Sequence, residues 1–357
     1  MNDFKIKKKM KHEIIYLLFA LLLFSCSEEH HVQESFSEMN DFFVEKESAI
    51  TTTTRSSSGP KDGFELNDEI HIYGYSKLTP GASTPAEGRN RFMPIADDVT
   101  PTIGAAYEFV SNQSGGWYRF YRDPSIDDGQ LIGFWRTRQY HDFAAYYFEP
   151  KPTTPVLEFE MDSDGLLQNE LLWGDTTDIY FSGEVQIIPR ITFKHQLSRI
   201  RVEGVHDMNI PTSSNFEIDW LELGLDKQKA SFDLETGKWS NILVSPLTLT
   251  AVPNTFLDEG NQLEPINIHE WWVLPGCTIS DFKLNIKRGT LSETKEVSFQ
   301  DFFDPDDTEP ITKPGYITVL RLEFGDAKSI IFTVSLEPWD LYRPENPIVI
   351  DDDTLID

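Results

Sequence analysis

The stretch from Ile191 to Val202 constrains the fold more than any other part of this sequence. Its apolar residues keep to alternate positions, first odd-numbered and then even-numbered: Ile191, Phe193, Leu197, Ile200 and Val202. Such alternation predicts a half-buried β-strand, because successive side chains point to opposite faces. The change from odd to even positions predicts a bulge or bend near Ser198. We interpret the stretch as the first core strand of a C-terminal domain.

Short runs with the same two-residue period follow one another along the rest of the chain. The clearest lie at residues 69–75, 156–161, 216–220, 281–287, 316–324 and 330–336. A nearly continuous apolar run at Asp142–Pro150 predicts a strand that is buried on both faces. No segment after the leader keeps a helical period, and turn-forming residues separate the runs. This pattern predicts an all-β protein built from β-sandwiches.

Length and charge set two further limits. A chain of 357 residues predicts two domains, whose limits we place at residues 56–183 and 184–339. The formal net charge of −28 argues against a nucleic-acid partner, because binding to a phosphate backbone needs clustered Lys and Arg.

Residues 1–25 have the pattern of a bacterial lipoprotein signal peptide. Lysines precede the apolar run Ile14–Phe24, which is shorter than the roughly 20 residues that a membrane-spanning helix needs. Ser25-Cys26 follows directly, and a small residue before a cysteine at this place is the lipobox arrangement. We predict cleavage before Cys26 and lipidation of its thiol, with acyl chains such as palmitate anchoring the protein in a membrane. The alternative is an ordinary secretory signal with an incidental cysteine.

The segment behind this anchor, residues 26–55, is interpreted as a tether or propeptide. It is polar and acidic apart from an aromatic cluster at Phe42-Phe43-Val44, and it ends in a run rich in Thr and Ser. That run fits either a loose linker or a docked strand, because Thr favours extended backbone. Arg55 is the only arginine between Cys26 and Arg89, so it is the candidate cleavage site for a trypsin-like protease.

The sequence does not predict an enzyme, and we expect no catalytic residue, cofactor or metal site. It has no Ser-His-Asp spacing, no phosphate-binding Gly-rich loop and no HExxH motif. His195 is interpreted as a structural histidine rather than a base or a ligand. The acidic cluster Asp301–Glu309 has oxygen ligands that could hold Ca²⁺, but the EF-hand glycine and spacing are absent and a solvated turn is favoured.

Two aromatic pairs and one cysteine have both a structural and a functional interpretation. Trp271-Trp272 and Trp117-Tyr118 could stack on sugar rings, but tryptophan in a β-sandwich is more often part of the core. With Cys26 lipidated, Cys277 is the only thiol of the folded body, so no disulfide forms within it. We interpret Cys277 as a small residue in the core or in a loop.

Several segments in a fixed order resemble the fimbrillin-like family of Bacteroidetes, which includes type V pilins and Mfa-like surface lipoproteins. After the lipobox leader they are Phe143–Tyr147, Leu171–Gly174, Phe193–Ile200, Leu274-Pro275, Pro314–Ile317, Ile330–Val334 and Pro338-Trp339. The acidic stretch Ser27–Glu29 likewise resembles the surface-export signal of Bacteroidetes lipoproteins. The resemblance implies two tandem transthyretin-like β-sandwich domains behind a lipoprotein signal peptide.

The resemblance also implies a function. In this family the precursor is a lipoprotein on the outer surface of the outer membrane, and an arginine-specific protease removes its N-terminal strand. The open groove then accepts a strand from a neighbouring subunit, and a fimbria grows. Arg55 best fits the cut, which leaves residues 56–357. The C-terminal tail, residues 340–357, is a candidate donor strand through Asn346–Ile350, and a disordered acidic tail is the alternative.

The implied partners are other fimbrial subunits, the membrane through the lipid anchor, and a host or bacterial surface ligand. Stalk, tip and anchor roles all stay open. The competing interpretation belongs to a different class of protein: a non-polymerising surface lipoprotein that binds glycan for nutrient uptake.

Overall fold

The computed structural model describes residues 41–46, 64–94, 103–112, 117–122, 135–166, 169–183, 187–206, 216–253, 255–257, 265–288, 290–299, 311–324 and 330–339. Within these ranges every regular element is a β-strand except one 3₁₀ turn, η1 at Pro85–Glu87. The prediction of an all-β protein is confirmed. In the same ranges no helix is long and apolar enough to cross a membrane.

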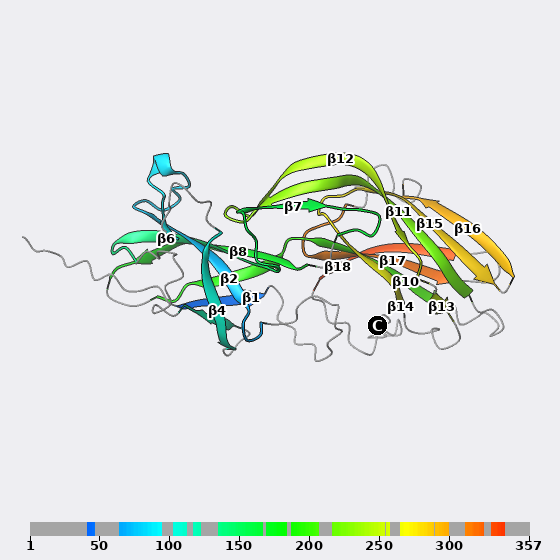
Figure 1. Cartoon of the computed structure of the whole chain (residues 1–357), viewed down its shortest axis with the longest axis horizontal. Helices are drawn as coiled ribbons and strands as arrows, with labels where there is room; N and C mark the ends of the chain where they lie inside the picture. Colours follow the sequence, from blue (N-terminus) through cyan, green and yellow to red (C-terminus); the bar gives the residue numbers. More distant parts are fainter. Residues whose placement is uncertain are drawn as a thin grey trace, which may run out of the picture.

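The N-terminal half forms one eight-stranded sheet that curls back on itself. Its order is β3-β2-β4-β5-β1-β9-β8-β6, and β6 also pairs with β2, so the sheet closes into a barrel-like ring (Figure 1). The strands are β1 (Asp41–Lys46), β2 (Glu69–Lys77), β3 (Asn90–Met93), β4 (Ala105–Asn112), β5 (Tyr118–Tyr121), β6 (Gln139–Phe148), β8 (Leu171–Phe181) and β9 (Arg190–His195). We call this sheet the barrel.

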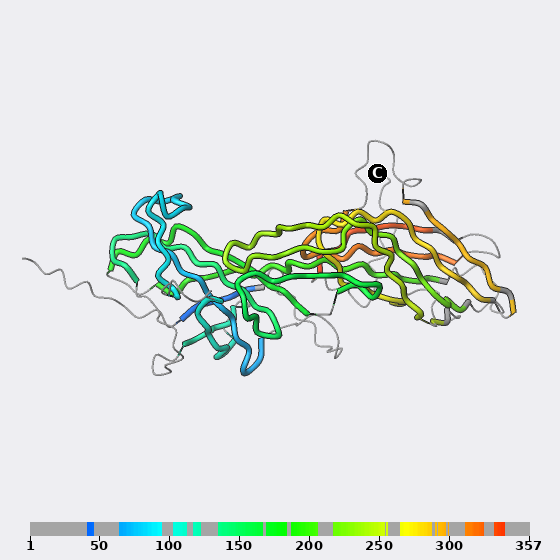
Figure 2. The backbone as a smooth tube through the Cα atoms, turned by 45° about the horizontal axis from the view of Figure 1, so that its top comes forward, coloured from blue at the N-terminus to red at the C-terminus, as the bar shows by residue number. Residues whose placement is uncertain are grey.

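The C-terminal half is a sandwich of two sheets, which gives the molecule its elongated outline (Figure 2). The four-stranded sheet has the order β14-β10-β17-β18, and the six-stranded sheet has the order β12-β11-β15-β16 with β7 and β13 also paired to β11. The strands are β7 (Val156–Glu160), β10 (Ser198–His206), β11 (Phe216–Asp233), β12 (Lys238–Ala251), β13 (Thr255–Leu257), β14 (Ile266–Val273), β15 (Ile279–Arg288), β16 (Leu291–Ser298), β17 (Tyr316–Phe324) and β18 (Ile330–Pro338).

Strands β2 and β6 form a wall between two cores. Along β6, Phe143 points into the barrel core, whereas Tyr146 belongs to the core of the sandwich. On β2, Ile72 and Tyr73 divide in the same way. Because side chains alternate along a strand, one strand can serve two cores only if both of its faces are apolar. The predicted strand with two buried faces is therefore confirmed.

The stretch from Ile191 to Val202 is split between the two halves. β9 ends at His195 and β10 begins at Ser198, so the predicted bend is confirmed. Ile191 packs in the barrel core and Val202 in the sandwich core. Since β9 pairs with β1 and β8 in the barrel, our interpretation of the whole stretch as a strand of the C-terminal domain is wrong for its first half. The domain limits themselves stay a prediction.

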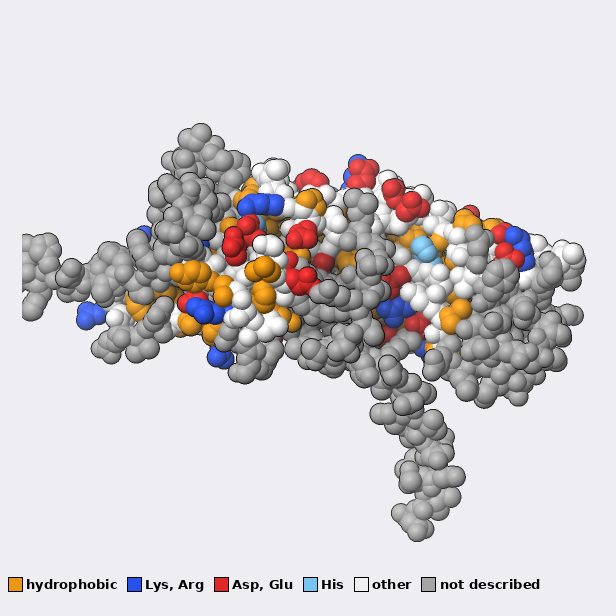
Figure 3. Space-filling model, turned by 60° about the horizontal axis from the view of Figure 1, so that its bottom comes forward, with side chains coloured by type: hydrophobic (Ala, Val, Ile, Leu, Met, Phe, Trp, Pro, Cys, Tyr) orange, Lys and Arg blue, Asp and Glu red, His pale blue; other side chains and the backbone are white. Residues whose placement is uncertain are grey.

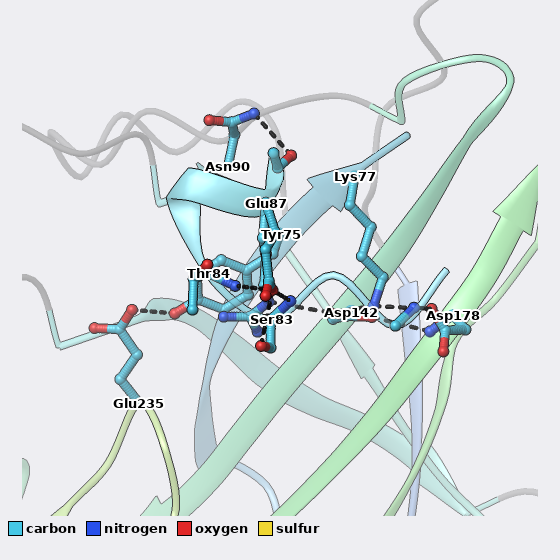
Figure 4. A network of polar contacts seen from close by, with 12 residues as sticks. Tyr75, Lys77, Ser83, Thr84, Glu87, Asn90, Asp142, Asp178 and Glu235 are labelled. Carbon is cyan, nitrogen blue, oxygen red and sulfur yellow. Dashed lines mark hydrogen bonds and ion pairs between the residues drawn. The ribbon is translucent and has the colours of Figure 1, made fainter. Parts of the chain in front are cut away.

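Strand β7 and the turn between β11 and β12 hold the two halves together. β7 precedes the barrel strands β8 and β9 in sequence but pairs with β11 of the sandwich. In the turn, Glu235 accepts a hydrogen bond from the hydroxyl of Tyr75 (Figure 4). It accepts a second one from Arg91 Nη1 at 3.2 Å. Trp173 Nε1 donates to the carbonyl of Leu234 at 2.9 Å. The tip of the β11–β12 hairpin is thereby docked on the barrel.

Candidate functional site

Strand β1 lies in the barrel wall between β5 and β9. It runs antiparallel to β5, from Asp41 opposite Tyr121 to Val44 opposite Tyr118, and parallel to β9. The amide of Phe43 also donates to the carbonyl of Pro189 at 2.9 Å. Part of the segment predicted as a tether or propeptide is therefore an integral strand of the fold.

The side chains of β1 alternate between the barrel core and the outer surface. Phe42 and Val44 are fully buried. The ring of Phe42 lies edge-on to Tyr107 at 4.9 Å and to Phe143 at 5.2 Å between centroids. Phe43 faces the other way and is half-buried, with Arg190 6.0 Å from its ring centroid. Burying two side chains of this kind stabilises the strand by about 3–6 kcal/mol.

One ion pair ties the start of β1 to its neighbour. Arg119 Nε on β5 donates to Asp41 Oδ1 at 2.7 Å. This hydrogen bond raises the pKa of Arg119 above its usual value. Both side chains are partly exposed, so the pair contributes to the register of β1 more than to its stability.

Without β1, the barrel would be an open sheet with a gap between β5 and β9. Both bordering strands would then present unpaired N–H and C=O groups along the gap. The pockets filled by Phe42 and Val44 would open into the core beside Tyr107 and Phe143. We call this gap the β1 slot. It is shaped for one extended strand with apolar side chains at alternate positions.

Four sequence predictions lie outside the described residues: the lipidated Cys26, the cleavage site Arg55, the cluster Asp301–Glu309 and the tail 340–357. The order of the chain still places Arg55 between β1 and Phe64, the next described residue. A cut at Arg55 would therefore separate β1 from every other described strand.

His195 is part of a packed cluster at the junction of the two halves. Its Nδ1 lies 3.0 Å from Glu170 Oε1, and both side chains are buried. Its ring stacks on Trp339 of the sandwich, with 4.6 Å between centroids and 2° between planes. Trp339 in turn meets Trp272 edge-on, and Arg199 lies 4.9 Å from the Trp339 centroid. These contacts support the structural interpretation of His195.

The aromatic pairs and the cysteine separate into core and surface residues. Trp271 and Trp272 are buried, so the sugar-stacking interpretation is wrong for this pair. Trp117 is half-buried beside Arg190, whose guanidinium carbon lies 5.1 Å from the ring centroid. Cys277 is fully buried, and burial raises the pKa of its thiol to about 12, which leaves it unreactive at neutral pH.

A charge cluster on β2, β6 and β8, in which Lys77 and Asp142 are buried and Asp178 is partly exposed, has no local sequence signature (Figure 4). Lys77 Nζ lies 2.8 Å from Asp142 Oδ1 and 2.8 Å from Asp178 Oδ1. Arg89 Nε donates to Asp142 Oδ2 at 3.0 Å. Burial alone would lower the pKa of Lys77, but its hydrogen bonds to the two carboxylates outweigh burial and raise that pKa. A charged amine is no nucleophile, so the cluster fixes the loop after β2 instead of supplying chemistry.

The described surface offers no concentrated basic region on the face drawn in Figure 3, where Lys and Arg side chains are scattered among acidic and hydrophobic ones. Within the described ranges, no group of three or more His, Cys, Asp or Glu side chains is placed to hold a metal ion. The β1 slot is therefore the feature with the clearest functional geometry.

Several solved structures are similar to this chain. A candidate cell adhesion protein from Bacteroides ovatus ATCC 8483 is 13% identical, with a TM-score of 0.49 and coverage of 87% of this chain and 100% of that chain. One from Bacteroides uniformis ATCC 8492 is 16% identical, with a TM-score of 0.48 and coverage of 85% and 100%. A fimbrial assembly protein from Parabacteroides distasonis ATCC 8503 is 9% identical, with a TM-score of 0.41 and coverage of 84% and 100%. No curated protein matches.

The family assignment rests on a match to a family model rather than on these structures. The model described as fimbrillin-like matches residues 52–339. The match begins after β1, includes Arg55 and extends to Trp339, the last described residue. Because it covers most of the sequence, this chain belongs to the fimbrillin-like family.

Proposed function

We propose that this protein is a structural or adhesive fimbrial subunit of a Bacteroidetes cell surface that assembles by strand exchange at the β1 slot. The observation that carries the proposal is the position of β1, which is a buried wall strand and yet precedes Arg55 in the chain. The fimbrillin-like family is a fimbrial type of protein and not an enzyme family.

A cut after Arg55 turns β1 from a tethered strand into a separate peptide. Within the separated segment, the strand β1 has six residues and inserts two side chains into the core, so it binds only weakly once it is no longer tethered. When it leaves, the slot exposes two strand edges and two apolar pockets. A strand from a second subunit can pair with both strand edges and fill both pockets. Such contacts run from head to tail and do not close, so they propagate into a filament.

The C-terminal tail supplies a candidate donor. It follows β18 and contains Ile348 and Ile350, which are two positions apart like Phe42 and Val44. Alternate positions on a strand share one face, so the two isoleucines fit the two pockets of the slot. If the donor runs opposite to β1, with Ile350 in the place of Phe42, Asp351 takes the place of Asp41, the partner of Arg119 at one end of the slot.

Export to the surface follows from the leader. Lipidation of Cys26 would hold the precursor in the outer membrane until the cut at Arg55 releases the subunit. The partners are then the membrane, for the precursor, and other fimbrial subunits, for the mature protein. An adhesive role adds a ligand on a host or bacterial surface. The glycan-uptake alternative is weaker because Trp271 and Trp272, which it would use, are buried.

The matched variant Arg55→Lys tests the proposal, because lysine keeps the charge but is not cut by an arginine-specific protease. In cells with the wild-type protein, N-terminal sequencing of surface-extracted subunits should begin at Ser56, and gels should show SDS-resistant ladders. Cells with Arg55→Lys should retain the segment from Cys26 onward and lose the ladders. Ladders built from subunits that begin at Cys26 would refute the cleavage step. Unchanged ladders after truncation behind Trp339 would refute the tail as donor.

A further inference from the structure

Strand β12 is a free edge of the six-stranded sheet. Among the described strands only β11 pairs with it, and Figure 1 shows β12 along the outer margin of the molecule. Three consecutive aliphatic side chains on this strand are exposed, with relative exposures of 47% for Ile242, 45% for Leu243 and 67% for Val244. Unpaired backbone groups next to exposed aliphatic side chains form a template for a further strand.

The distribution of charge indicates which strand fits this edge. From Trp239 to Ala251 the strand has no charged residue, whereas the chain as a whole carries a net charge of −28. Two copies that met through other parts of their surface would bring acidic side chains together, and like charges repel across an interface. The uncharged edge of β12 avoids this repulsion, so it suits contact with an identical chain.

We propose that two copies of this chain pair through their β12 strands, antiparallel, around a two-fold axis at Leu243. Such an isologous contact uses the same patch on both subunits. In this register Leu243 faces Leu243, and Ile242 faces Val244 of the other copy. The exposed aliphatic side chains of both copies then meet at the centre of the joint sheet, where opposed aliphatic pairs stabilise a strand pair.

The residues on either side of this centre are compatible with the same register. The β11–β12 pairing shifts register on both sides of Leu243, but residues 239–251 carry no charge, so like charges do not oppose each other there. Pro246, which has no N–H to donate, lies outside the aliphatic centre. Asn241 has a positive φ of 50° and donates from Nδ2 to Ser231 Oγ at 3.1 Å, which fixes the bulge at the start of the aliphatic run.

This contact is distinct from the β1 slot. β12 belongs to the sandwich and β1 to the barrel, so a subunit can use both surfaces at once. The slot joins subunits head to tail, whereas the β12 edge joins them side by side. A ladder of a few residues buries a small area, so the pair is weak in dilute solution and gains from the high local concentration of surface-bound copies.

Cysteine trapping on intact cells tests the proposal with the full chain in place. A Leu243→Cys variant puts two thiols at directly opposed positions, whose Cβ atoms are about 5 Å apart in a strand pair. Mild oxidation should give a covalent dimer on non-reducing gels. Leu78→Cys is the matched control, because Leu78 is 74% exposed but lies beyond the end of β2. The wild-type chain controls for Cys26, and Cys277 is buried.

The expected result is a dimer from Leu243→Cys that exceeds both controls by at least roughly tenfold. Adding Val244→Asp to Leu243→Cys should lower the dimer yield by a similar factor at equal surface amounts, read from reducing gels of the same samples. Equal yields from Leu243→Cys and Leu78→Cys would overturn the proposal. So would cross-linking of position 243 only to a protein of another mass.

Discussion

The packing of Phe42 gives the sharpest test of how β1 is held in the barrel. Its side chain is fully buried and lies edge-on to the rings of Tyr107 and Phe143. Truncating a buried phenylalanine to alanine costs about 3–5 kcal/mol. Phe43, the next residue, faces outward and is half-buried next to Arg190. Phe43→Ala is therefore a matched control, for which we expect a cost of about 1 kcal/mol.

Hydrogen exchange of the β1 amides in the uncut precursor is the assay. These amides exchange when β1 leaves its slot, without unfolding of the whole chain. A loss of about 3–5 kcal/mol is comparable to the whole free energy that holds the tethered strand, so the β1 amides of Phe42→Ala should lose nearly all their protection, against an acceleration of less than roughly tenfold in Phe43→Ala. Exchange in β17, in the other core, should stay unchanged in both variants. Equal acceleration by the two variants would refute the reasoning, because the inward side chain would then not hold the strand.

Three further predictions concern other contacts. Arg119→Ala removes the 2.7 Å hydrogen bond to Asp41. Because this pair is partly exposed, the free energy of unfolding measured in urea titrations should fall by at most about 1 kcal/mol, and by less at high salt. Burial lowers the pKa of His141 from 6.5 to about 4, so the unfolded chain binds more protons than the folded chain between these pH values. Urea titrations should therefore show about 3 kcal/mol less stability at pH 4 than at pH 7. Gly237→Ala would put a Cβ 2.5 Å from the Trp173 ring at a φ of +66°, so calorimetry should show a lower Tm, equivalent to about 1–3 kcal/mol.

Two controls make the last predictions specific. Hydrogen bonding to His71 lowers the pKa of Glu69 to about 2, so its stabilising contribution is lost only as pH falls below about 4.5. Burial lowers the pKa of His269 as well, so a smaller loss of stability below pH 6.5 should remain in His141→Phe. A loss in His141→Phe as large as in the wild type would contradict the assignment to His141. Gly81 also has a positive φ, of +78°, but has nothing within 4 Å of an added Cβ. If Gly81→Ala and Gly237→Ala cost the same, contact with Trp173 does not explain the effect.

Local alternation was enough to predict most strands, because the faces of a strand are set by its own side chains. The runs at residues 281–287 and 316–324 correspond to β15 and β17. Phe42-Phe43-Val44 carries the same signal, since two apolar residues two positions apart point inward. The sequence did not show which strands would pair with this segment. The strands β5 and β9 that border β1 lie far along the chain, and strand propensity depends strongly on such neighbours.

Sheet membership could not be predicted where the two halves meet. β9 and β10 both alternate, and their sequences do not indicate that the bend between them separates two cores. The Lys77–Asp142 pair illustrates the same limit, because the two residues are 65 positions apart and meet only through the pairing of β2 with β6. Within its own segment, neither residue can be told from any other charged residue. The candidate site depends on long-range pairing of this kind, so the sequence predicted its parts but not their arrangement.

Under the proposed function, β1 must be held firmly before the cut and released after it. Its two inward side chains contribute about 3–6 kcal/mol, which as a free binding energy corresponds to dissociation constants from millimolar to tens of micromolar. A short tether supplies an effective concentration of the order of millimolar, which exceeds the tighter of these dissociation constants and so keeps such a strand in place. After the cut, the lipidated segment stays in the membrane and the subunit diffuses away, so the two are diluted far below these constants and do not bind again. Proteolysis at Arg55 would thus open the slot without weakening any contact of β1, and a donor strand presented by a neighbouring subunit needs only comparable contacts to take its place.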